Sequence, residues 1–468
     1  MGAFCLFYVA DRGKIGAATN SNLKQEVYTL ATQLKAPIPS PPVQKREIFG
    51  WAMYDFANSG YSTVVITTVF SAYFVGVVAG NGSSSGMATF LWTIAIAVSN
   101  ALVVLSAPVV GAIADYSASK KLFLGITTVG CVVFTALLAT AGPKETVLAM
   151  TLIVLSNFMF ASGENFVASF LPEISTQDNM GRISAYGWTL GYFGGLLVLG
   201  ICLVYVQIAQ GQGQSAQQYV PATMIIVAVA FALAALPTFI WVRERAVPEP
   251  GASHIHYIRV GFSRLKHTIE HARHYKDLFR FLITLTIYSC GINTVIVLAA
   301  VYAQEVMGFT TNDNIKLILV VNVTAAIGAF LFGMAEDRIG SKNTVLITLL
   351  IWCAATVMAY FIHDRLWFWV VANLVGIAMG SSQSAGRAMV GIFSPAERCG
   401  EFFGLWGLAT KLSAIIGPVL YGVITNITNG QQRVALLSTT AFFILGMIML
   451  ATVNEKRGRE AVYRKADN

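Results

Sequence analysis

The sequence predicts an all-α membrane protein whose twelve transmembrane helices form two six-helix bundles, and two observations support this fold class. Hydrophobic residues make up 56% of the 468 residues and charged residues only 12%, with a mean hydropathy of +0.65. Soluble domains usually carry about 25% charged residues. In addition, one short Gly/Asp signature occurs twice, 222 residues apart. A duplicated bundle in lipid explains both features and is typical of secondary transporters.

Twelve apolar stretches are each long enough to cross about 30 Å of hydrocarbon as a helix. The expected spans are 48–79, 88–113, 122–141, 146–171, 182–209, 221–242, 278–304, 314–335, 343–361, 366–393, 400–426 and 434–453. The resulting organisation is a leader (1–44), an N-terminal bundle (45–243), a cytoplasmic linker (244–277), a C-terminal bundle (278–455) and a basic tail (456–468). Apolar residues recur at helical spacing from 258 to 272 opposite a basic face, which predicts an amphipathic linker helix on the inner leaflet.

The basic residues sort by side of the membrane. If both termini are cytoplasmic, 25 of the 31 Lys and Arg residues fall in cytoplasmic segments. The positive-inside rule therefore predicts this orientation for an integral plasma-membrane protein. The net charge of +8 reflects that sorting and does not indicate nucleic-acid binding. Membrane lipid, a small-molecule substrate and protons are the expected partners, and we expect a monomer.

Nothing in the sequence indicates a metal, a cofactor or an enzymatic activity. The six cysteines stand singly, without metal-ligand or redox spacing. His267, His271 and His274 share one helical face, but a solvated basic face explains them better than a metal site does. Nucleotide-binding and hydrolase motifs are absent from the sequence.

The repeated signature predicts a conformational role. Its copies are GAIADYSASKK, with Gly111 and Asp115, and GMAEDRIGSK, with Gly333, Asp337, Arg338 and Lys342. We expect Asp337 near the start of the next helix, making charge–dipole and ion-pair contacts in one access state. The alternative is a simple polar turn.

Asp55 is the first of four charged candidates that stand out within the predicted spans, where an ionisable group costs a few kcal/mol and is functional by default. It shares a polar stripe with Asn58, Ser59 and Ser62 at helical spacing. The stripe predicts proton coupling or recognition of a cationic group. The alternative is a fixed salt bridge that locks the two halves together.

Glu164 and Lys411 are also placed in apolar surroundings. A desolvated Glu164 can carry a proton, or it can be a hydrogen-bonded residue that positions its helix. Lys411 is expected close to mid-membrane, where it needs an acidic partner or a water-filled cavity. A role in transport is the first interpretation, and a structural partnership with Glu401 or a carboxylate of the N-terminal half is the second.

Gln383 and Arg387 lie one turn apart in GSSQSAGRAM. The planar guanidinium of Arg387 suits a substrate carboxylate. It also suits a pair with Asp55 that closes the cytoplasmic side, and we favour this gate because Arg387 is only about two turns from the inner end. Gln383 sits deeper and is the better candidate for substrate contact. Gly187, Gly191 and Gly195 form a ridge that predicts close helix packing.

This architecture resembles the major facilitator superfamily from about residue 45 to 455. The signature is similar to that superfamily's loop motif between helices 2 and 3 and between helices 8 and 9. The second copy is complete, whereas the first has Tyr116 in place of the usual Arg and Ala118 in place of a Gly. The implied gating role is therefore expected more firmly for the second copy.

Three blocks narrow the resemblance: WAMYDFANSGYSTVVITTVFSAYF (51–74), GRISAYGWTLGYFGG (181–195) and GSSQSAGRAM with EFFGLWGLATKLSAIIGP (380–418). Together they resemble the vacuole-effluxer-like branch, which includes fungal vacuolar amino-acid exporters and bacterial members. This resemblance implies a secondary transporter, with amino-acid-like solutes as the favoured substrates. Two alternatives remain open: transport of peptides or cell-wall fragments, and a non-transporting receptor or scaffold.

Overall fold

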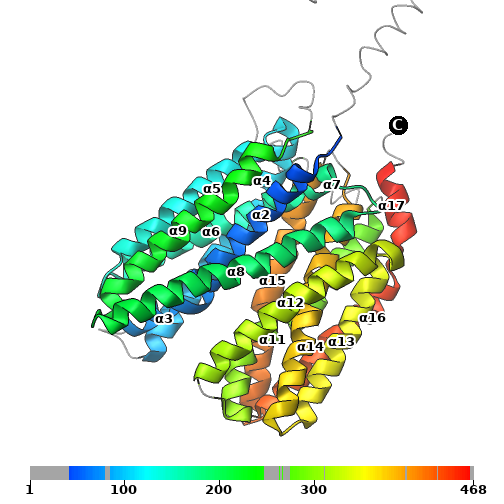
Figure 1. The fold of residues 1–468 in the computed structure, drawn as a ribbon. Coiled ribbons are helices and arrows are strands. Elements are labelled where there is room, and N and C mark those ends of the chain that lie inside the picture. The colour runs from blue at the N-terminus through cyan, green and yellow to red at the C-terminus, as the bar shows by residue number, and fades with distance from the viewer. Residues whose placement is uncertain are drawn as a thin grey trace, which may run out of the picture. The chain divides into compact units, whose positions relative to one another are not determined.

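The computed structural model describes residues 42–79, 85–246, 275–309, 311–395, 398–429 and 431–463, with single positions at 263 and 266. Within these ranges the chain is helical nearly throughout, and twelve helices are long and apolar enough to cross a membrane (Figure 1). The predicted fold class and the twelve spans are confirmed. Most of the predicted leader, nearly all of the amphipathic linker helix and the three linker histidines lie outside the described residues.

The first six spans form the N-half. Its helices are α2 (Lys45–Tyr61), continued by η1 (Ser62–Thr68), α3 (Val69–Tyr73) and η2 (Phe74–Val78), then α4 (Ser85–Ser117), α5 (Lys120–Leu137) with η3 (Leu138–Thr140), α6 (Thr146–Ser169), the short α7 (Leu171–Ile174), α8 (Met180–Gly211) and α9 (Ala216–Trp241). The segments η1 and η2 are π-helical, so the first span departs from α geometry in its second part.

The last six spans form the C-half. They are α11 (Lys276–Met307), α12 (Thr311–Ile339), α13 (Ser341–Phe361), α14 (Arg365–Ile392), α15 (Cys399–Ile427) and α16 (Gln432–Ala451), and a short helix α17 (Glu455–Tyr463) follows them. Because the spans are even in number, α2 begins and α16 ends on the same side. We call this side the terminal end and the opposite side the far end.

The most extensive contacts between the halves are those of α4 with α15 and of α8 with α12 (Figure 1). Further contacts join α8 to α14 and α6 to α15. The signature glycines lie at the two most extensive contacts. A Cβ at Gly111 would overlap the carbonyl oxygen of Gly400 on α15, and a Cβ at Gly333 would overlap the Cβ of Ala185 on α8. Glycine at both positions therefore lets helices of opposite halves approach closely at the terminal end.

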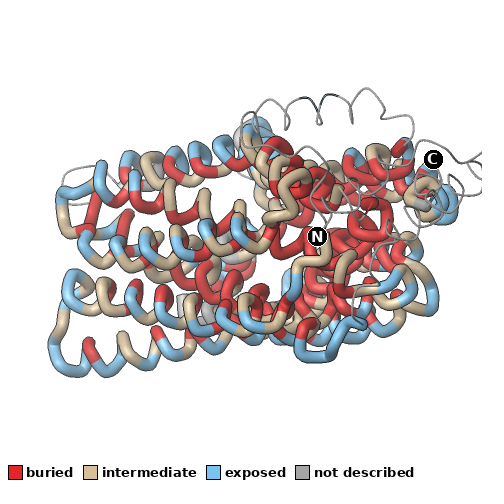
Figure 2. The backbone as a smooth tube through the Cα atoms, turned by 90° about the horizontal axis from the view of Figure 1, so that it is seen from above, coloured by how far each residue is buried: buried red, intermediate tan, exposed pale blue. Residues whose placement is uncertain are grey.

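Burial separates the lipid-facing surface from the interior (Figure 2). Large apolar side chains stay exposed on the outside of the bundles, for example Leu105, Val147 and Leu366, each about three-quarters exposed. These faces suit hydrocarbon, in which apolar exposure carries no penalty. Polar and charged side chains are instead enclosed between helices, so the interior is where recognition and gating must occur.

Helix packing within the C-half provides a test of the fold. A Cβ at Gly380 on α14 would overlap the carbonyl oxygen of Ala325 on α12. We expect Gly380→Val to lower the free energy of unfolding by about 1–3 kcal/mol, because the two backbones must separate. Gly200→Ala is the control, since a Cβ there meets nothing within 4 Å. Thermal unfolding of the purified protein checks both, and equal melting temperatures would contradict the packing.

Candidate functional site

Asp55 and Arg387 form an ion pair across the two halves, although 332 residues separate them. Arg387 Nη1 on α14 lies 2.7 Å from Asp55 Oδ2 on α2. The side chain of Arg387 is only 3% exposed and that of Asp55 only 11% exposed. Arg387 also donates from Nε to Ser184 Oγ at 3.1 Å and from Nη2 to Ser184 O at 2.8 Å. The sequence left two partners open for Arg387, a substrate carboxylate and Asp55. In the structure Arg387 pairs with Asp55.

Aromatic rings and a glycine enclose this pair. The guanidinium carbon of Arg387 lies 4.7 Å from the ring centroid of Trp51 and 5.3 Å from that of Trp188, within range of cation–π attraction. Gly187 provides the space, because a Cβ there would overlap the Asp55 carboxylate. The predicted glycine ridge of α8 thus packs against α2. Breaking such a pair without replacing a partner leaves a buried charge, which is strongly unfavourable.

Glu164 and Lys411 form a second, looser pair. Lys411 Nζ on α15 lies 3.4 Å from Glu164 Oε2 on α6, and the side chains are 18% and 29% exposed. The acidic partner that Lys411 was expected to need is therefore a carboxylate of the N-half, not Glu401. Because both charged groups remain partly accessible, a polar solute can reach them without first breaking a sealed core.

Uncommitted polar atoms surround the two pairs. Asn58 Oδ1, Asn165 Nδ2, Trp188 Nε1 and Ser384 Oγ are buried and have no hydrogen-bond partner. Asn58 is one turn from Asp55, Asn165 follows Glu164 and Ser384 follows Gln383 in the sequence, while the Trp188 ring lies against the guanidinium of Arg387. Such atoms are available to a polar solute or to water. Together with the ion pairs they give the interior between the two halves a polar character.

Gln383 and Ser59, the other predicted contact residues, line the same region. Gln383 Oε1 accepts a hydrogen bond from Tyr192 Oη at 2.6 Å, and its side chain is only half-buried. Ser59 is half-buried, and its Oγ would lie 2.9 Å from a Cβ at Gly191. Both hydroxyl and amide groups thus lie between α2, α8 and α14, where the halves meet.

The first signature aspartate holds the start of a helix in the other half. Asp115 accepts hydrogen bonds from the backbone N–H groups of Gly400 and Glu401, both at 2.9 Å. Lys120 lies 3.2 Å from Asp115 and 2.8 Å from Glu173. Despite its departures from the superfamily pattern, the first copy makes the more buried contact of the two. The sequence departures of the first copy therefore do not prevent its contact with the other half.

The second signature aspartate also contacts the start of a helix in the other half. Asp337 accepts a hydrogen bond from Arg182 N at 3.2 Å and pairs with Arg182 Nε at 3.3 Å, both on α8. The charge–dipole and ion-pair contacts expected of Asp337 are thus made to the start of α8, in the other half. At the start of α13, Glu455 accepts the N–H of Lys342 at 3.1 Å. Arg338 is exposed.

A repeated charge network at the terminal end was missed by the sequence analysis. Glu244 accepts the N–H groups of Lys120 and Lys121, at 2.6 and 3.2 Å, as Glu455 accepts that of Lys342. The signal was present as VRER after the sixth span and VNEKR after the twelfth. Burial raises the pKa of the Glu244 carboxyl, and the two N–H groups oppose this shift.

Metal binding finds no support in the part of the chain that the structure describes. Within it, no group of three or more His, Cys, Asp or Glu side chains is arranged to hold an ion. The described side chains of the site offer hydrogen-bonding and ion-pairing groups.

The buried pair predicts a strong thermodynamic coupling. Asp55→Asn should lower the free energy of unfolding by about 3–5 kcal/mol, because it leaves Arg387 buried and unpaired. Adding Arg387→Met should recover part of this loss, since no charge then remains. The control cycle uses Arg182 and Asp337, whose partly exposed pair should be worth about 0–1 kcal/mol. Thermal unfolding measures both cycles, and additive losses at Asp55 and Arg387 would refute the coupling.

Comparisons with known proteins agree with this geometry. The family model described as "Vacuole effluxer Atg22 like" matches residues 85–462. The Uncharacterized MFS-type transporter YxiO of Bacillus subtilis (strain 168) is 29% identical over 89% of this chain and 97% of its own length. Autophagy-related protein 22-1 of Aspergillus fumigatus is 23% identical, over 59% of this chain and 49% of its own length. The chain therefore spans about half the length of this fungal relative.

The fold is shared with solved transporters. The major facilitator transporter FucP, in its outward conformation, superposes with a TM-score of 0.68 at 14% identity, covering 87% of this chain and 98% of that one. Because the family model covers most of the sequence and the curated relatives and this fold agree with it, this chain belongs to the Atg22-like vacuole effluxer family of major facilitator transporters.

Proposed function

We propose that this transporter moves a small polar solute by alternating access, in which the N-half rocks against the C-half. The proposal rests on two ion pairs, Asp55–Arg387 and Glu164–Lys411. Each pair has one residue in the N-half and one in the C-half. A rocking motion must break or rearrange both. Charges inside spans are costly, so their placement where the halves part supports a functional role.

The terminal end is proposed to be the cytoplasmic side, with both termini there, in a monomer of the plasma membrane. The excess of Lys and Arg in the terminal-end segments supports this orientation. At this end the halves are held together by Asp115 on the start of α15, by Asp337 on the start of α8 and by the Asp55–Arg387 pair. The described state is thus closed towards the cytoplasm, and Asp55–Arg387 is the innermost part of that gate.

The Glu164–Lys411 pair is proposed as the substrate site. Its two charges are opposite in sign, 3.4 Å apart and partly exposed. A zwitterion such as an amino acid presents an ammonium and a carboxylate, which can replace each partner of the pair in turn. Gln383 and Asn165 add hydrogen-bonding groups nearby. A peptide or cell-wall fragment remains the second candidate, because it carries the same end groups on a larger body.

Proton coupling is proposed to follow from the same arrangement. When Lys411 turns to a substrate carboxylate, Glu164 loses the cation that lies 3.4 Å away, and a proton can take the place of that cation. Asp55 is the second proposed coupling carboxylate, because it lies inside a span and pairs with Arg387 of the other half. Replacement of the Lys411 ammonium by a proton at Glu164 would link proton binding to substrate binding.

Ligand-induced stabilisation tests the substrate class. We would screen amino acids, dipeptides, organic anions and muropeptides by thermal shift on the purified protein, and then measure uptake of the hits into proteoliposomes. A ligand at about 100 times its dissociation constant should stabilise the fold by roughly 2.7 kcal/mol. Lys411→Ala should abolish both the shift and the uptake, whereas the exposed Lys456→Ala should not. Binding without uptake in wild type would favour a receptor.

Removal of the two carboxylates tests the proton coupling. We expect Glu164→Gln, Asp55→Asn or both to abolish the pH dependence of uptake, because neither amide can bind the coupled proton. Uptake should be measured with and without an imposed pH gradient, using the hit from the ligand screen. The conservative Asp178→Asn change, at a fully solvated carboxylate, serves as the control. Unchanged pH dependence in both variants would contradict the coupling.

A further inference from the structure

Each signature copy contains one buried ionisable residue, Lys120 or Glu336, that has no charged counterpart in the other copy. Lys121 and Lys342 are equivalent, because the ammonium of each donates to a carbonyl at the end of the sixth or twelfth span, Val242 O at 2.6 Å and Val453 O at 2.7 Å. Their N–H groups also bind the equivalent glutamates Glu244 and Glu455. When Lys121 and Lys342 are aligned, Ser341 of the second copy corresponds to Lys120 of the first. When Asp115 and Asp337 are aligned instead, Glu336 of the second copy corresponds to Ala114 of the first.

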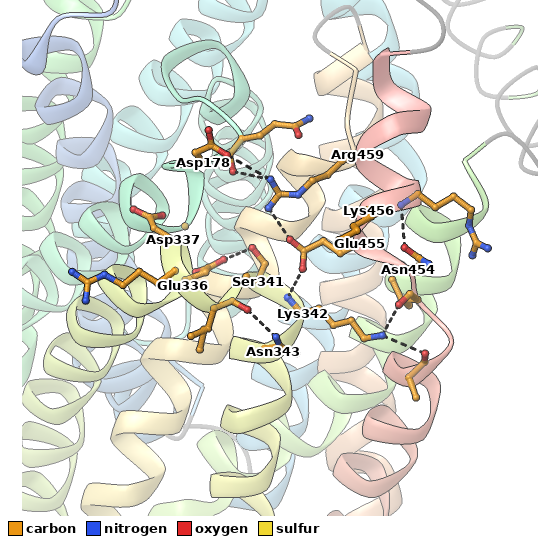
Figure 3. A pocket seen from close by; sticks show the side chains of 18 of the residues that line it. Asp178, Glu336, Asp337, Ser341, Lys342, Asn343, Asn454, Glu455, Lys456 and Arg459 are labelled. Atoms are coloured by element: carbon orange, nitrogen blue, oxygen red, sulfur yellow. Dashed lines mark hydrogen bonds and ion pairs between the residues drawn. The ribbon is translucent and has the colours of Figure 1, made fainter.

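In the first copy the buried carboxylate is balanced by a cation. Lys120 is fully buried and lies within ion-pair distance of both Asp115 and Glu173. The second copy has a hydroxyl in place of this ammonium. Glu336 is 3% exposed, and its Oε1 accepts a hydrogen bond from Ser341 Oγ at 2.6 Å (Figure 3). Its Oε2 is buried and has no hydrogen-bond partner.

The charged groups around Glu336 do not replace the lost cation. Asp337 on its own helix and Glu455 on α17 are acidic. Arg459, the cation on α17 that acts on Glu336, is already bonded to Glu455 Oε1 at 2.7 Å (Figure 3). On α13, the Lys342 ammonium donates to backbone carbonyls. From the N-half, Arg182 pairs with Asp337, and Asp178 is exposed and acidic.

The other half of the protein covers this carboxyl group. A Cβ at Gly181, on the second residue of α8, would overlap the carboxyl carbon of Glu336. Gly181 and Glu336 both line a cavity of about 770 Å³ at the terminal end, beside α17. When α8 moves away, this side of Glu336 becomes exposed to the water of the cavity. The contact of α8 with α12 therefore also buries the Glu336 carboxyl group.

We propose that Glu336 is a proton-binding switch of the terminal end, distinct from the transported-proton candidates Asp55 and Glu164. It is protonated while the halves are closed there. On opening, its O–H bond breaks and the proton passes to water in the cavity, leaving a solvated carboxylate. The inference rests on the proposed alternating access, because it requires the terminal end to open.

The direction of the pH effect follows from linkage. The closed state holds one proton more than the open state, so raising the pH favours opening. Between the pKa of Glu336 in the open state and that in the closed state, the ratio of open to closed molecules should rise about tenfold per pH unit. Once Glu336 is ionised, repulsion from Asp337 and Glu455 opposes reclosure. The first signature copy lacks this response, because Lys120 compensates its buried carboxylate.

A distance measurement across the terminal end tests the switch. Spin labels at Thr176→Cys and Lys456→Cys, both exposed positions on opposite halves, report opening in lipid nanodiscs with the other cysteines replaced. Over about pH 5 to 9, the open fraction of otherwise wild-type protein should rise with pH. Glu336→Gln, which imitates the neutral acid, should stay closed at every pH. The matched control Asp178→Asn removes an exposed carboxylate beside the same cavity and should titrate as wild type.

Infrared difference spectra provide an independent readout. The carbonyl band of a protonated carboxyl group should disappear as the pH rises, and Glu336→Gln should lack this band. Ser341→Ala should retain the band and the pH-dependent opening, since the acid itself remains. An open fraction independent of pH in wild type, or an unchanged response in Glu336→Gln, overturns the switch.

The label distance also separates this inference from the proposed function. If a transported solute changes the distance but pH does not, the switch is wrong and alternating access stands. If neither the solute nor pH changes the distance, both proposals fail.

Discussion

The ion pair between Arg387 and Asp55 is the interaction on which the closed terminal end depends. Both charges are enclosed by protein, because the side chain of Arg387 is 3% exposed and that of Asp55 is 11% exposed. Trp51, Trp188 and Ser184 complete the surroundings of the guanidinium. A buried pair of this kind contributes little net stability compared with apolar packing, but it is very costly to break halfway. It therefore favours two discrete arrangements of the halves over a continuum.

Helix starts provide the second element of closure. Asp115 and Asp337 each place a carboxylate on backbone N–H groups that have no partner within their own helix, in the opposite half of the protein. The partial positive charge at a helix start adds to this attraction. Because both contacts require close helix approach, the signature needs a glycine one turn before each aspartate. The glycine and the aspartate thus act as one unit, with shape and charge matched to the same partner.

The duplicated architecture is not symmetric in its charges. One copy of the signature contains a buried lysine and the other a buried glutamate bonded to a serine. Asp115 accepts two backbone N–H groups of α15 and Asp337 accepts one of α8, so the carboxylate of each copy holds a helix start in the other half. The two copies differ in what closure does to ionisable groups, because only the second removes an acid from water without supplying a cation. Gene duplication followed by such a change gives two otherwise equivalent contacts different responses to pH.

The sequence by itself determined the fold class and the family, because apolar span length and the repeated motif are local properties that lipid selects directly. It also located the charges that matter, since any ionisable residue in a span stands out against the hydrocarbon. Only the tertiary structure decided how they pair: Lys411 with Glu164 and not Glu401, and Asp337 with α8 of the other half. Partners in opposite halves are hundreds of residues apart, and helix rotation and crossing fix which side chains meet. The same reason hid Glu336, whose significance lies in the engagement of its neighbouring cations elsewhere, Arg459 with Glu455 and Arg182 with Asp337. Which groups these cations bind is a fact of three-dimensional packing that no local pattern records.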